Sequence, residues 1–325
     1  MASNTLVSVI IPAYNAAQTI KRAIHSVLSQ SYHHIEVIVV DDGSNDDTVE
    51  CVKSFGKQVH CIVQQNGGAG AARNRGAQAA TGEWIAFLDA DDEWHSRKLE
   101  IQLQYRDVAA NVVLISNTPV IVRPGQQESF RDIDGKPGFF IWEHRAFLRR
   151  NRIHTSSALI KREAYQAVGG CDITLLNAQD RDLWLKLLYY GKGICIDSPL
   201  TKYYHIGGSL SHNLVRRFNC DLTLIDRWDN RQPGNLDINK TVPVKEFCKI
   251  KYAAMFTMIF KLMRIGFVAD AKDFWQRLCI FHKKTYPFVP CIPWLLFVAL
   301  ARMEKIRKRV KYGTMRDDLH TDSPG

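Results

Sequence analysis

The chain has 325 residues, 46% of them hydrophobic, which suffices for one large domain with a sizeable core or for a domain with an appendage. Its formal charge of +10 favours an anionic partner such as phosphate, nucleic acid or an acidic membrane. The eight cysteines are scattered without a CxxC pair, which argues against a zinc site or a disulfide framework and is typical of reduced thiols in a cytosolic protein.

Neither a signal peptide nor a membrane-spanning helix is expected. Met1–Thr5 is polar and leads directly into a predicted strand. No run of 18 or more apolar residues occurs in the chain. A cytoplasmic location is therefore expected.

Strands and helices alternate over roughly the first 100 residues. The predicted strands are Leu6–Pro12, Ile35–Val40, Val59–Val63 and Trp84–Leu88. The predicted helices are Ala16–Gln30, Asp47–Phe55 and Ala69–Ala80. This alternation is typical of a parallel sheet with right-handed crossovers, so we expect a doubly wound α/β fold.

Beyond about residue 110 the alternation loosens. The strands expected there are Val112–Val122 and Ser156–Ile160, and the expected helices are Phe139–Arg150, Arg162–Val168 and Asn177–Tyr190. Helical patterns return at Lys245–Ile265 and Ala269–Phe281. We therefore expect an α/β domain over residues 1–215, a helical region over 216–313 and a disordered tail over 314–325.

Three carboxylates crowd the end of the fourth predicted strand. Asp89, Asp91 and Asp92 follow Trp84–Leu88 within four positions. Like charges this close repel one another unless a cation or hydrogen-bond donors hold them. Because ligands bind at the carboxyl ends of strands in α/β sheets, this cluster predicts a divalent metal with a phosphorylated ligand.

Several short motifs occur in one order along residues 6–211. They are Pro12-Ala-Tyr-Asn15, Val39-Val-Asp-Asp-Gly-Ser44, Ala72-Arg-Asn-Arg-Gly76, Gly82-Glu-Trp84, Leu88-Asp-Ala-Asp-Asp92 and Gln179-Asp-Arg-Asp-Leu-Trp184. Together they resemble the family 2 glycosyltransferases, inverting enzymes of the GT-A fold that use nucleotide sugars. The resemblance implies a GT-A-like, Rossmann-like, mostly parallel sheet flanked by helices, followed here by a C-terminal helical appendage.

Asp89-Ala-Asp91 matches the DxD motif of that family. The resemblance implies that Asp91 binds Mg²⁺ or Mn²⁺ on the diphosphate and that Asp89 contacts the ribose or the sugar. Such a cation stabilises the charge that grows on the departing nucleoside diphosphate, and oxygen ligands suit it. The alternative is an Asp-rich turn that begins a helix near Ser96–Tyr105.

A nucleotide site at the ends of the first two strands is also implied. Asp42 would accept the N3–H of uracil or thymine, and the base would be lined by Pro12, Tyr14 and Asn15. Tyr14 offers a stacking surface. The alternative for Asp41–Asn45 is a turn with a helix N-cap, and it is stronger for Asp41 than for Asp42.

Arg73 would help to hold the base or the phosphates. The surrounding Gly68-Ala-Gly70-Ala-Ala-Arg73 superficially matches a dinucleotide fingerprint. It lacks the third glycine and follows the third strand, so we interpret it as a tight loop that lets a helix pack closely.

Asp180 is the candidate general base. Inverting transfer needs one carboxylate that takes the proton of the acceptor hydroxyl as it attacks the anomeric carbon. The family has Glu before this Asp, whereas Gln179 stands here. The alternative is that Asp180 only begins a helix.

Tyr203–Ser211 resembles the lid that closes on the diphosphate in relatives. His205 occupies a place near which many relatives have Arg, and it would contact the metal or a phosphate; a surface-loop histidine is the alternative. A Q-x-x-R-W motif, which marks processive synthases, does not occur in the sequence, so transfer of one sugar per acceptor visit is expected.

The C-terminal region combines apolar and basic segments. Phe288–Ala301 is too short and too interrupted by proline to span a membrane, and six basic residues follow it within 302–311. Docking on the anionic cytoplasmic face of a membrane is expected, with a helical subdomain that has a solvated basic face as the alternative. No nucleic-acid-binding module is recognisable.

The sequence thus predicts a metal-dependent, inverting transferase. The donor would be a UDP- or dTDP-sugar, and the acceptor a glycan or lipid-linked hydroxyl in cell-surface polysaccharide or lipopolysaccharide synthesis. A non-catalytic nucleotide-sugar sensor or assembly factor is the alternative. It draws on Gln179 and on Lys186, which stands where the family often has Arg.

Overall fold

The computed structural model describes residues 5–142, 144, 147, 151, 153–175 and 178–204, and in the C-terminal part 215, 219–224, 253, 255–263 and 268–285. The chain divides into two compact units. The first comprises Met1–His212 with Gln232–Leu236, and the second Asn213–Arg231 with Asp237–Gly325. The apolar and basic segments expected to dock on a membrane, and the tail 314–325, lie outside the described residues.

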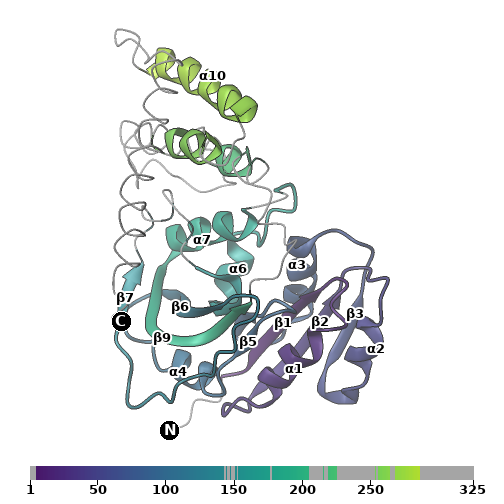
Figure 1. Ribbon diagram of the computed structural model, residues 1–325. Helices are drawn as coiled ribbons and strands as arrows, with labels where there is room; N and C mark the ends of the chain where they lie inside the picture. Colours follow the sequence, from purple (N-terminus) through teal and green to yellow (C-terminus); the bar gives the residue numbers. More distant parts are fainter. Residues whose placement is uncertain are drawn as a thin grey trace, which may run out of the picture. The chain divides into compact units, whose positions relative to one another are not determined.

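A nine-stranded sheet organises the first unit (Figure 1). Its parallel part has the order β3-β2-β1-β4, formed by β1 (Val7–Ala13), β2 (Ile35–Asp41), β3 (His60–Val63) and β4 (Trp84–Phe87). These strands and their order along the chain confirm the predicted alternation. Because the four strands are parallel, their carboxyl ends meet at one edge of the sheet, where loops carrying the candidate site residues begin.

Helices cover both faces of this parallel part. α1 (Ile20–Leu28) and α2 (Thr48–Lys53) lie on one face, and α3 (Ala69–Ala79) lies on the other (Figure 1). Alternate residues of β1 explain the arrangement. Val9 joins the core that includes α1, whereas Ile10 faces α3, where a Cβ on Gly76 would come within 2.4 Å of its Cγ2. The glycine lets α3 approach the sheet closely.

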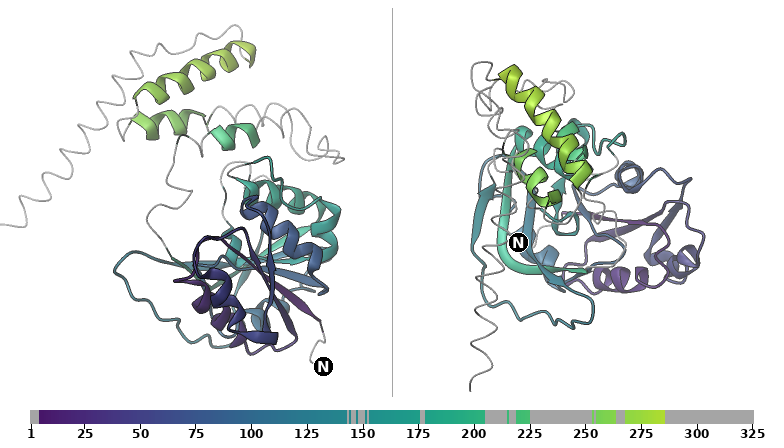
Figure 2. Two further views of the ribbon diagram at one scale, coloured as in Figure 1. Left: turned by 90° about the vertical axis from the view of Figure 1, so that its right-hand side faces the viewer. Right: turned by 45° about the horizontal axis from the view of Figure 1, so that its top comes forward.

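The remaining strands extend and curl the sheet. From β4 the order continues β8 (Leu159–Lys161), β6 (Val112–Val122), β9 (Lys192–Tyr204) and β5 (Glu93–Trp94), and β7 (Phe139–Trp142) pairs with β9. The long β9 curves along β6, as two views show (Figures 1 and 2). β8 runs antiparallel to β4, with Leu159 opposite Ala86. This pairing places the residues before β8 beside those after β4.

Two expectations for this half of the sheet are corrected. The helix predicted over Phe139–Arg150 is wrong at its start, since Phe139–Trp142 forms β7 against Ile194 and its neighbours on β9. Aromatic and β-branched residues suit such an edge strand, and tertiary pairing overrides the helical spacing. The strand predicted at Ser156–Ile160 begins later, because residues 155–157 form a 3₁₀ turn, η2, before β8.

The helices that follow agree better with expectation. α6 (Arg162–Ala167) and α7 (Gln179–Tyr190) correspond to predicted helices, and α7 begins two residues later than expected. Its Leu183, Trp184 and Leu187 are buried. A helix near Ser96–Tyr105 is also present as α4 (Lys98–Leu103).

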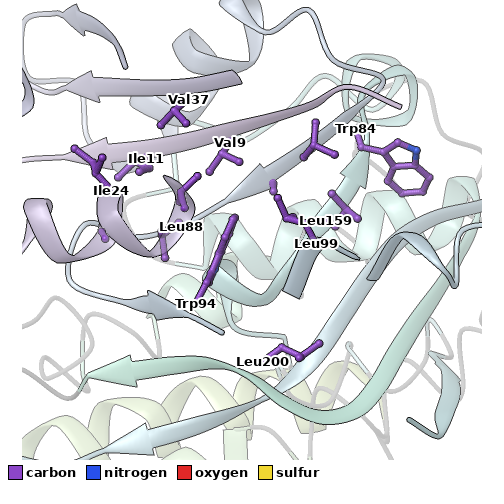
Figure 3. Packing of buried hydrophobic residues seen from close by; sticks show 14 of the residues in the cluster. Val9, Ile11, Ile24, Val37, Trp84, Leu88, Trp94, Leu99, Leu159 and Leu200 are labelled. Carbon is purple, nitrogen blue, oxygen red and sulfur yellow. The ribbon is translucent and has the colours of Figure 1, made fainter. Parts of the chain in front are cut away.

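One core cluster lies behind the turn after β4. Figure 3 shows several of its members, among them Leu88, Trp94, Leu99 and Leu200. The Trp94 indole N–H donates to the carbonyl of Ser156 at 2.7 Å, which fixes η2 against the core. Lys98 is fully buried, its Nζ 3.9 Å from the Trp94 ring centroid and 2.7 Å from Gln102 Oε1. Burial lowers the pKa of Lys98 well below its ordinary value.

The second unit has a separate apolar cluster. It includes Met258, Leu262, Phe274 and Leu278. α10 (Val268–Thr285) supplies the last two and contains the helix predicted over Ala269–Phe281. Among the described residues, none of the helices has the length and apolar content needed to cross a bilayer.

Candidate functional site

The loops after β1 and β2 are joined by hydrogen bonds. The Asp42 N–H donates to the carbonyl of Ala13 at 2.8 Å, and the Asn45 N–H donates to Asn15 Oδ1 at 2.9 Å. Asn15 has a φ of +48°, a conformation that asparagine tolerates well. Tyr14 is 50% exposed at this edge, so its ring is available to a planar ligand. Pro12 lies opposite Val40, inside the sheet.

Asp42 is buried and acts as an anchor within the protein. Its Oδ1 accepts hydrogen bonds from Gln64 Nε2 at 2.8 Å and from the Gly67 N–H at 2.9 Å, and its Oδ2 accepts from the Gly68 N–H at 2.8 Å. The carboxylate thereby ties the end of β2 to the start of α3. Because a carboxylate has about four acceptor positions, it keeps capacity for one further donor.

Asp41 shapes the turn that the alternative predicted, whereas the N-cap position of α2 is occupied by Asp47. Its carboxylate accepts hydrogen bonds from both the backbone N–H and the hydroxyl of Ser44. This is an Asx-type turn, which shapes the loop after β2.

Arg73 and Asp89 form the central ion pair of the site. Arg73 Nη2 lies 2.6 Å from Asp89 Oδ1, and the two side chains are 10% and 29% exposed. The pair joins α3 to the turn after β4. Arg73 Nε has no hydrogen-bond partner in the described structure. A guanidinium that one carboxylate does not saturate suits an anionic ligand.

Asp91 and Asp92 lie in different surroundings. Burial and the nearby charge of Asp89 raise the pKa of Asp91 to about 6. Asp92 is fully buried, where it accepts hydrogen bonds from the Ser156 hydroxyl and from the Tyr204 N–H. Its pKa is raised well above the ordinary value by burial and by both neighbouring aspartates. Asp92 thus holds β9 and η2 to the turn.

Asp180 stands at the start of α7, facing this turn. Its Oδ1 accepts from the Arg181 N–H at 2.8 Å, and its Oδ2 accepts from Asn151 Nδ2 at 2.6 Å. Burial raises the pKa of Asp180, while these donors and the charge of Arg73 oppose the rise. Asp89 adds to the rise, so the structure brings Arg73, Asp89 and Asp180 close enough for their charges to interact.

Two departures from the family pattern have local structural roles. Gln179 Nε2 donates to the carbonyl of Leu175, which a glutamate could not do, and its side chain occupies the space that a Cβ on Gly70 would take. Lys186 Nζ forms a 2.6 Å ion pair with the buried carboxylate of Asp182 one turn earlier. These contacts account for Gln179 and Lys186 at their positions without invoking a loss of catalysis.

Several site residues were not identified from sequence. Asn151, His154 and Ser156 precede β8 and reach this edge because β8 is antiparallel to β4. The ring of His154 contacts Tyr203 at a centroid distance of 4.8 Å, and burial lowers its pKa while Asp180 and Asp89 raise it. The polar residues before the short strand β8 were the signal that could have identified them. The sequence did not show, however, in which direction β8 runs in the sheet.

A divalent metal is compatible with part of this arrangement. Among the residues that the structure describes, no three His, Cys, Asp or Glu side chains form a cluster suited to a metal. The carboxylate of Asp91 is nevertheless a hard oxygen ligand whose charged form is disfavoured by burial and by Asp89, and a cation would relieve both effects. His205, the other predicted ligand, lies outside the described residues.

Comparison with known proteins identifies the family. Residues 8–169 match the sequence profile described as Glycosyl transferase family 2. The Escherichia coli protein named UDP-Glc:alpha-D-GlcNAc-diphosphoundecaprenol beta-1,3-glucosyltransferase WfaP is 31% identical over 225 residues, which cover 66% of this chain and 84% of WfaP. The chain belongs to glycosyltransferase family 2. An uncharacterized glycosyltransferase of Rickettsia prowazekii is 32% identical over 60% of this chain.

This chain matches less than two thirds of the length of the two Rickettsia relatives. The matched region spans 64% of the Rickettsia prowazekii relative and 61% of a Rickettsia typhi relative. Among solved structures, Staphylococcus aureus TarS 1-349 in complex with UDP-GlcNAc has a TM-score of 0.63 at 17% identity, covering 85% of this chain and 80% of that one. The Pyrobaculum calidifontis mannosyltransferase with GDP-Man and Mn²⁺ has a TM-score of 0.59 at 18% identity, covering 97% and 84%. These matches confirm the GT-A-like α/β fold.

Proposed function

We propose that this protein transfers a sugar from a UDP- or dTDP-sugar to a hydroxyl of a glycan or lipid-linked acceptor, with inversion at the anomeric carbon. The strongest support is that Asp180 lies close enough to Arg73 and Asp89 for their charges to interact. These three residues lie at the edge of the sheet where the parallel strands end, as do Asp42 and Tyr14. One carboxylate is thus available for the acceptor beside groups suited to a nucleotide diphosphate.

The donor would lie across the loops after β1, β2 and β4. Tyr14 would stack on the base and Asp42 would accept the N3–H of uracil or thymine, with Pro12 and Asn15 shaping the same loop. Arg73 would bind the base or a phosphate through guanidinium N–H groups that Asp89 does not engage. Asp89, held by Arg73, would contact the ribose or the sugar.

Asp180 would act as the general base. It would take the proton of the acceptor hydroxyl as that oxygen attacks the anomeric carbon from the face opposite the diphosphate. The new glycosidic C–O bond forms as the bond to the diphosphate breaks, and the nucleoside diphosphate leaves with the electron pair. An α-linked donor therefore gives a β-linked product.

Asp91 would hold Mg²⁺ or Mn²⁺, with His205 as a further ligand. When bound, the cation neutralises charge on the departing diphosphate. Support comes from the chemistry of the Asp91 carboxylate and from the mannosyltransferase neighbour, whose structure contains Mn²⁺.

Cell-surface polysaccharide or lipopolysaccharide synthesis is the proposed context. The name of WfaP specifies a UDP-sugar donor and a diphosphoundecaprenol-linked acceptor. An acceptor of that kind is anchored in a membrane, which suits a cytoplasmic protein peripheral to the inner face. We propose that the basic run Arg302–Lys311 and the apolar segment before it provide this contact.

A nucleotide-release assay tests the proposal. Purified full-length protein with Mn²⁺ or Mg²⁺ is offered UDP-, dTDP- and GDP-sugars with and without a GlcNAc-diphosphoundecaprenol-type acceptor. We expect acceptor-dependent release of UDP or dTDP from at least one donor, and a product whose anomeric configuration by NMR is opposite to the donor's. Donor binding by calorimetry without turnover on any acceptor would instead favour the sensor.

Vesicle co-sedimentation tests the membrane contact separately. A full-length variant with serine at the basic positions of 302–311 should bind anionic vesicles more weakly than the unmodified protein does. Equal binding by the two proteins would contradict the proposed docking.

A further inference from the structure

The segment 151–157 contacts both halves of the candidate site. Asn151 Nδ2 donates to Asp180 Oδ2 at 2.6 Å. Five residues later, Ser156 Oγ accepts from the Asp89 N–H at 3.0 Å and donates to the Asp92 carboxylate. The segment thereby spans from the proposed base to the carboxylate turn, because the antiparallel start of β8 lies beside the end of β4.

The orientation of the Asn151 amide is fixed by its second bond. Asn151 Oδ1 accepts from the N–H of Ile153, whose side chain is buried, at 3.2 Å. With the oxygen so occupied, Nδ2 is the atom that faces Asp180, and a carboxylate requires a donor at that place. Asn151 is thus a preset donor toward one oxygen of Asp180.

Besides Asn151, the described residues give Asp180 one further hydrogen-bond donor and one nearby positive charge, Arg73. Its Oδ1 accepts only from the Arg181 N–H of its own helix among the hydrogen bonds of the described residues. The charged and titratable groups that face it from other elements are Arg73 on α3, Asp89 after β4, His154 in the same segment as Asn151, and Cys171 before α7. Burial and the charge of Asp89 disfavour the charged carboxylate, so the two hydrogen-bond donors act together with the charge of Arg73 to keep it ionised.

We propose that Asn151 is a positioning residue for the general base: its amide holds Asp180 ionised and aims the remaining acceptor positions of the carboxylate toward the acceptor hydroxyl. This inference rests on the proposed function of Asp180. A carboxylate oxygen that accepts one hydrogen bond keeps a second acceptor position, which is where the hydroxyl proton would arrive. The same bond ties the base to the segment that holds the carboxylate turn.

The Asn151→Asp variant tests this role with little change in shape. It replaces the amide nitrogen that faces Asp180 with an oxygen. The new carboxyl group and that of Asp180 would then lie about as close together as Asn151 and Asp180 do now, and they would share one proton. We expect kcat at pH 7 to fall at least about tenfold, with the acidic limb of the kcat profile moved to higher pH and the donor KM unchanged. Asn151→Ala, which adds no charge, should shift the limb in the same direction by less.

Asn111→Asp is the matched control. Asn111 Nδ2 donates to the carbonyl of Tyr190 at 3.0 Å, in an exposed position at the opposite end of α7, so this variant also removes an amide-donated bond and adds the same charge. It should leave kcat and the pH limb as they are. An equal shift in the control, or none in either Asn151 variant, would overturn the proposal.

A titration without substrate separates this inference from the proposed function. The ¹³C carboxyl signal of Asp180, assigned with Asp180→Asn, should titrate at higher pH in Asn151→Asp and Asn151→Ala than in the unmodified protein or in Asn111→Asp. Absence of turnover in the unmodified protein would count against the transferase activity, whereas an unmoved Asp180 titration would contradict the positioning role itself.

Discussion

Arg73 of α3 and Asp89 of the turn after β4 form a 2.6 Å ion pair in which neither side chain is more than 29% exposed. Loss of one partner of a buried pair costs more than loss of both, because a charge then remains without compensation. Because Asp89 keeps some contact with solvent, the unpaired carboxylate costs less than in a fully buried pair. We expect Arg73→Met to lower the free energy of unfolding by about 1–3 kcal/mol.

The double variant Arg73→Met, Asp89→Asn should be less destabilised than the sum of its single variants. Urea unfolding of all four proteins gives the coupling energy. Additive effects, within about 0.5 kcal/mol, would contradict the pairing.

Asp91 makes the metal-free protein sensitive to pH. Its folded pKa is about 6, above the ordinary value of 3.8, so the folded state holds a proton that the unfolded chain has already released. This carboxyl therefore destabilises the protein as pH rises from about 4 to about 6, and the full penalty persists above that range.

In the presence of EDTA, Asp91→Asn should be more stable than the unmodified protein at pH 7.5, by on the order of 1–3 kcal/mol. The gain should shrink as pH falls and be nearly gone near pH 4, where the folded Asp91 carboxyl is protonated. Removal of the Asp91 charge also lowers the raised pKa of Asp92, which adds to the gain at pH 7.5. Unfolding free energies at the two pH values check this, and a gain that does not change with pH would contradict it.

Asp42 combines a structural and a proposed binding role. In Asp42→Asn an amide N–H would face the N–H of Gly67 or Gly68, leaving a donor without an acceptor. We expect a loss of stability of about 1–3 kcal/mol and at least about tenfold weaker UDP binding by calorimetry. Asp47→Asn, at an exposed position nearby, is the control and should bind UDP normally.

Gly76 sets the distance between α3 and the sheet. A Cβ there would lie 2.4 Å from Ile10 Cγ2, so Gly76→Ala should destabilise the protein by about 1–3 kcal/mol through overpacking. Gly138→Ala is the control, because no atom lies within 4 Å of its added Cβ. Equal thermal midpoints for the two variants would show that α3 packs less closely than described.

The parallel half of the fold could be predicted from sequence because short stretches of sequence determine its strands and helices. Buried parallel strands such as Ile35–Val40 form apolar runs that end in turn residues, and helices of the right period lie between them. Since parallel strands end at one edge, the same pattern placed Asp42 and Asp89 together. Their proposed roles came from the family resemblance and stay predictions.

The rest of the site depends on pairing that no local pattern encodes. Asn151 and Ser156 reach Asp180 and Asp89 only because β8 runs antiparallel to β4, and the three residues of β8 carry no mark of direction. Phe139–Trp142 has apolar residues that fit a helix or a strand, and its pairing with β9 decides between them. His205 and the C-terminal segments lie outside the described residues, so their roles stay predictions.

The most direct test of the transferase mechanism is Asp180→Asn, assayed for both sugar transfer and donor binding. The amide preserves the shape of the carboxylate but cannot take the acceptor proton at neutral pH. We predict that transfer falls by roughly 10²–10⁴-fold while the Kd for the UDP-sugar, measured by calorimetry, is unchanged. Retention of transfer, or loss of donor binding in its place, would contradict the assignment of Asp180 as the base.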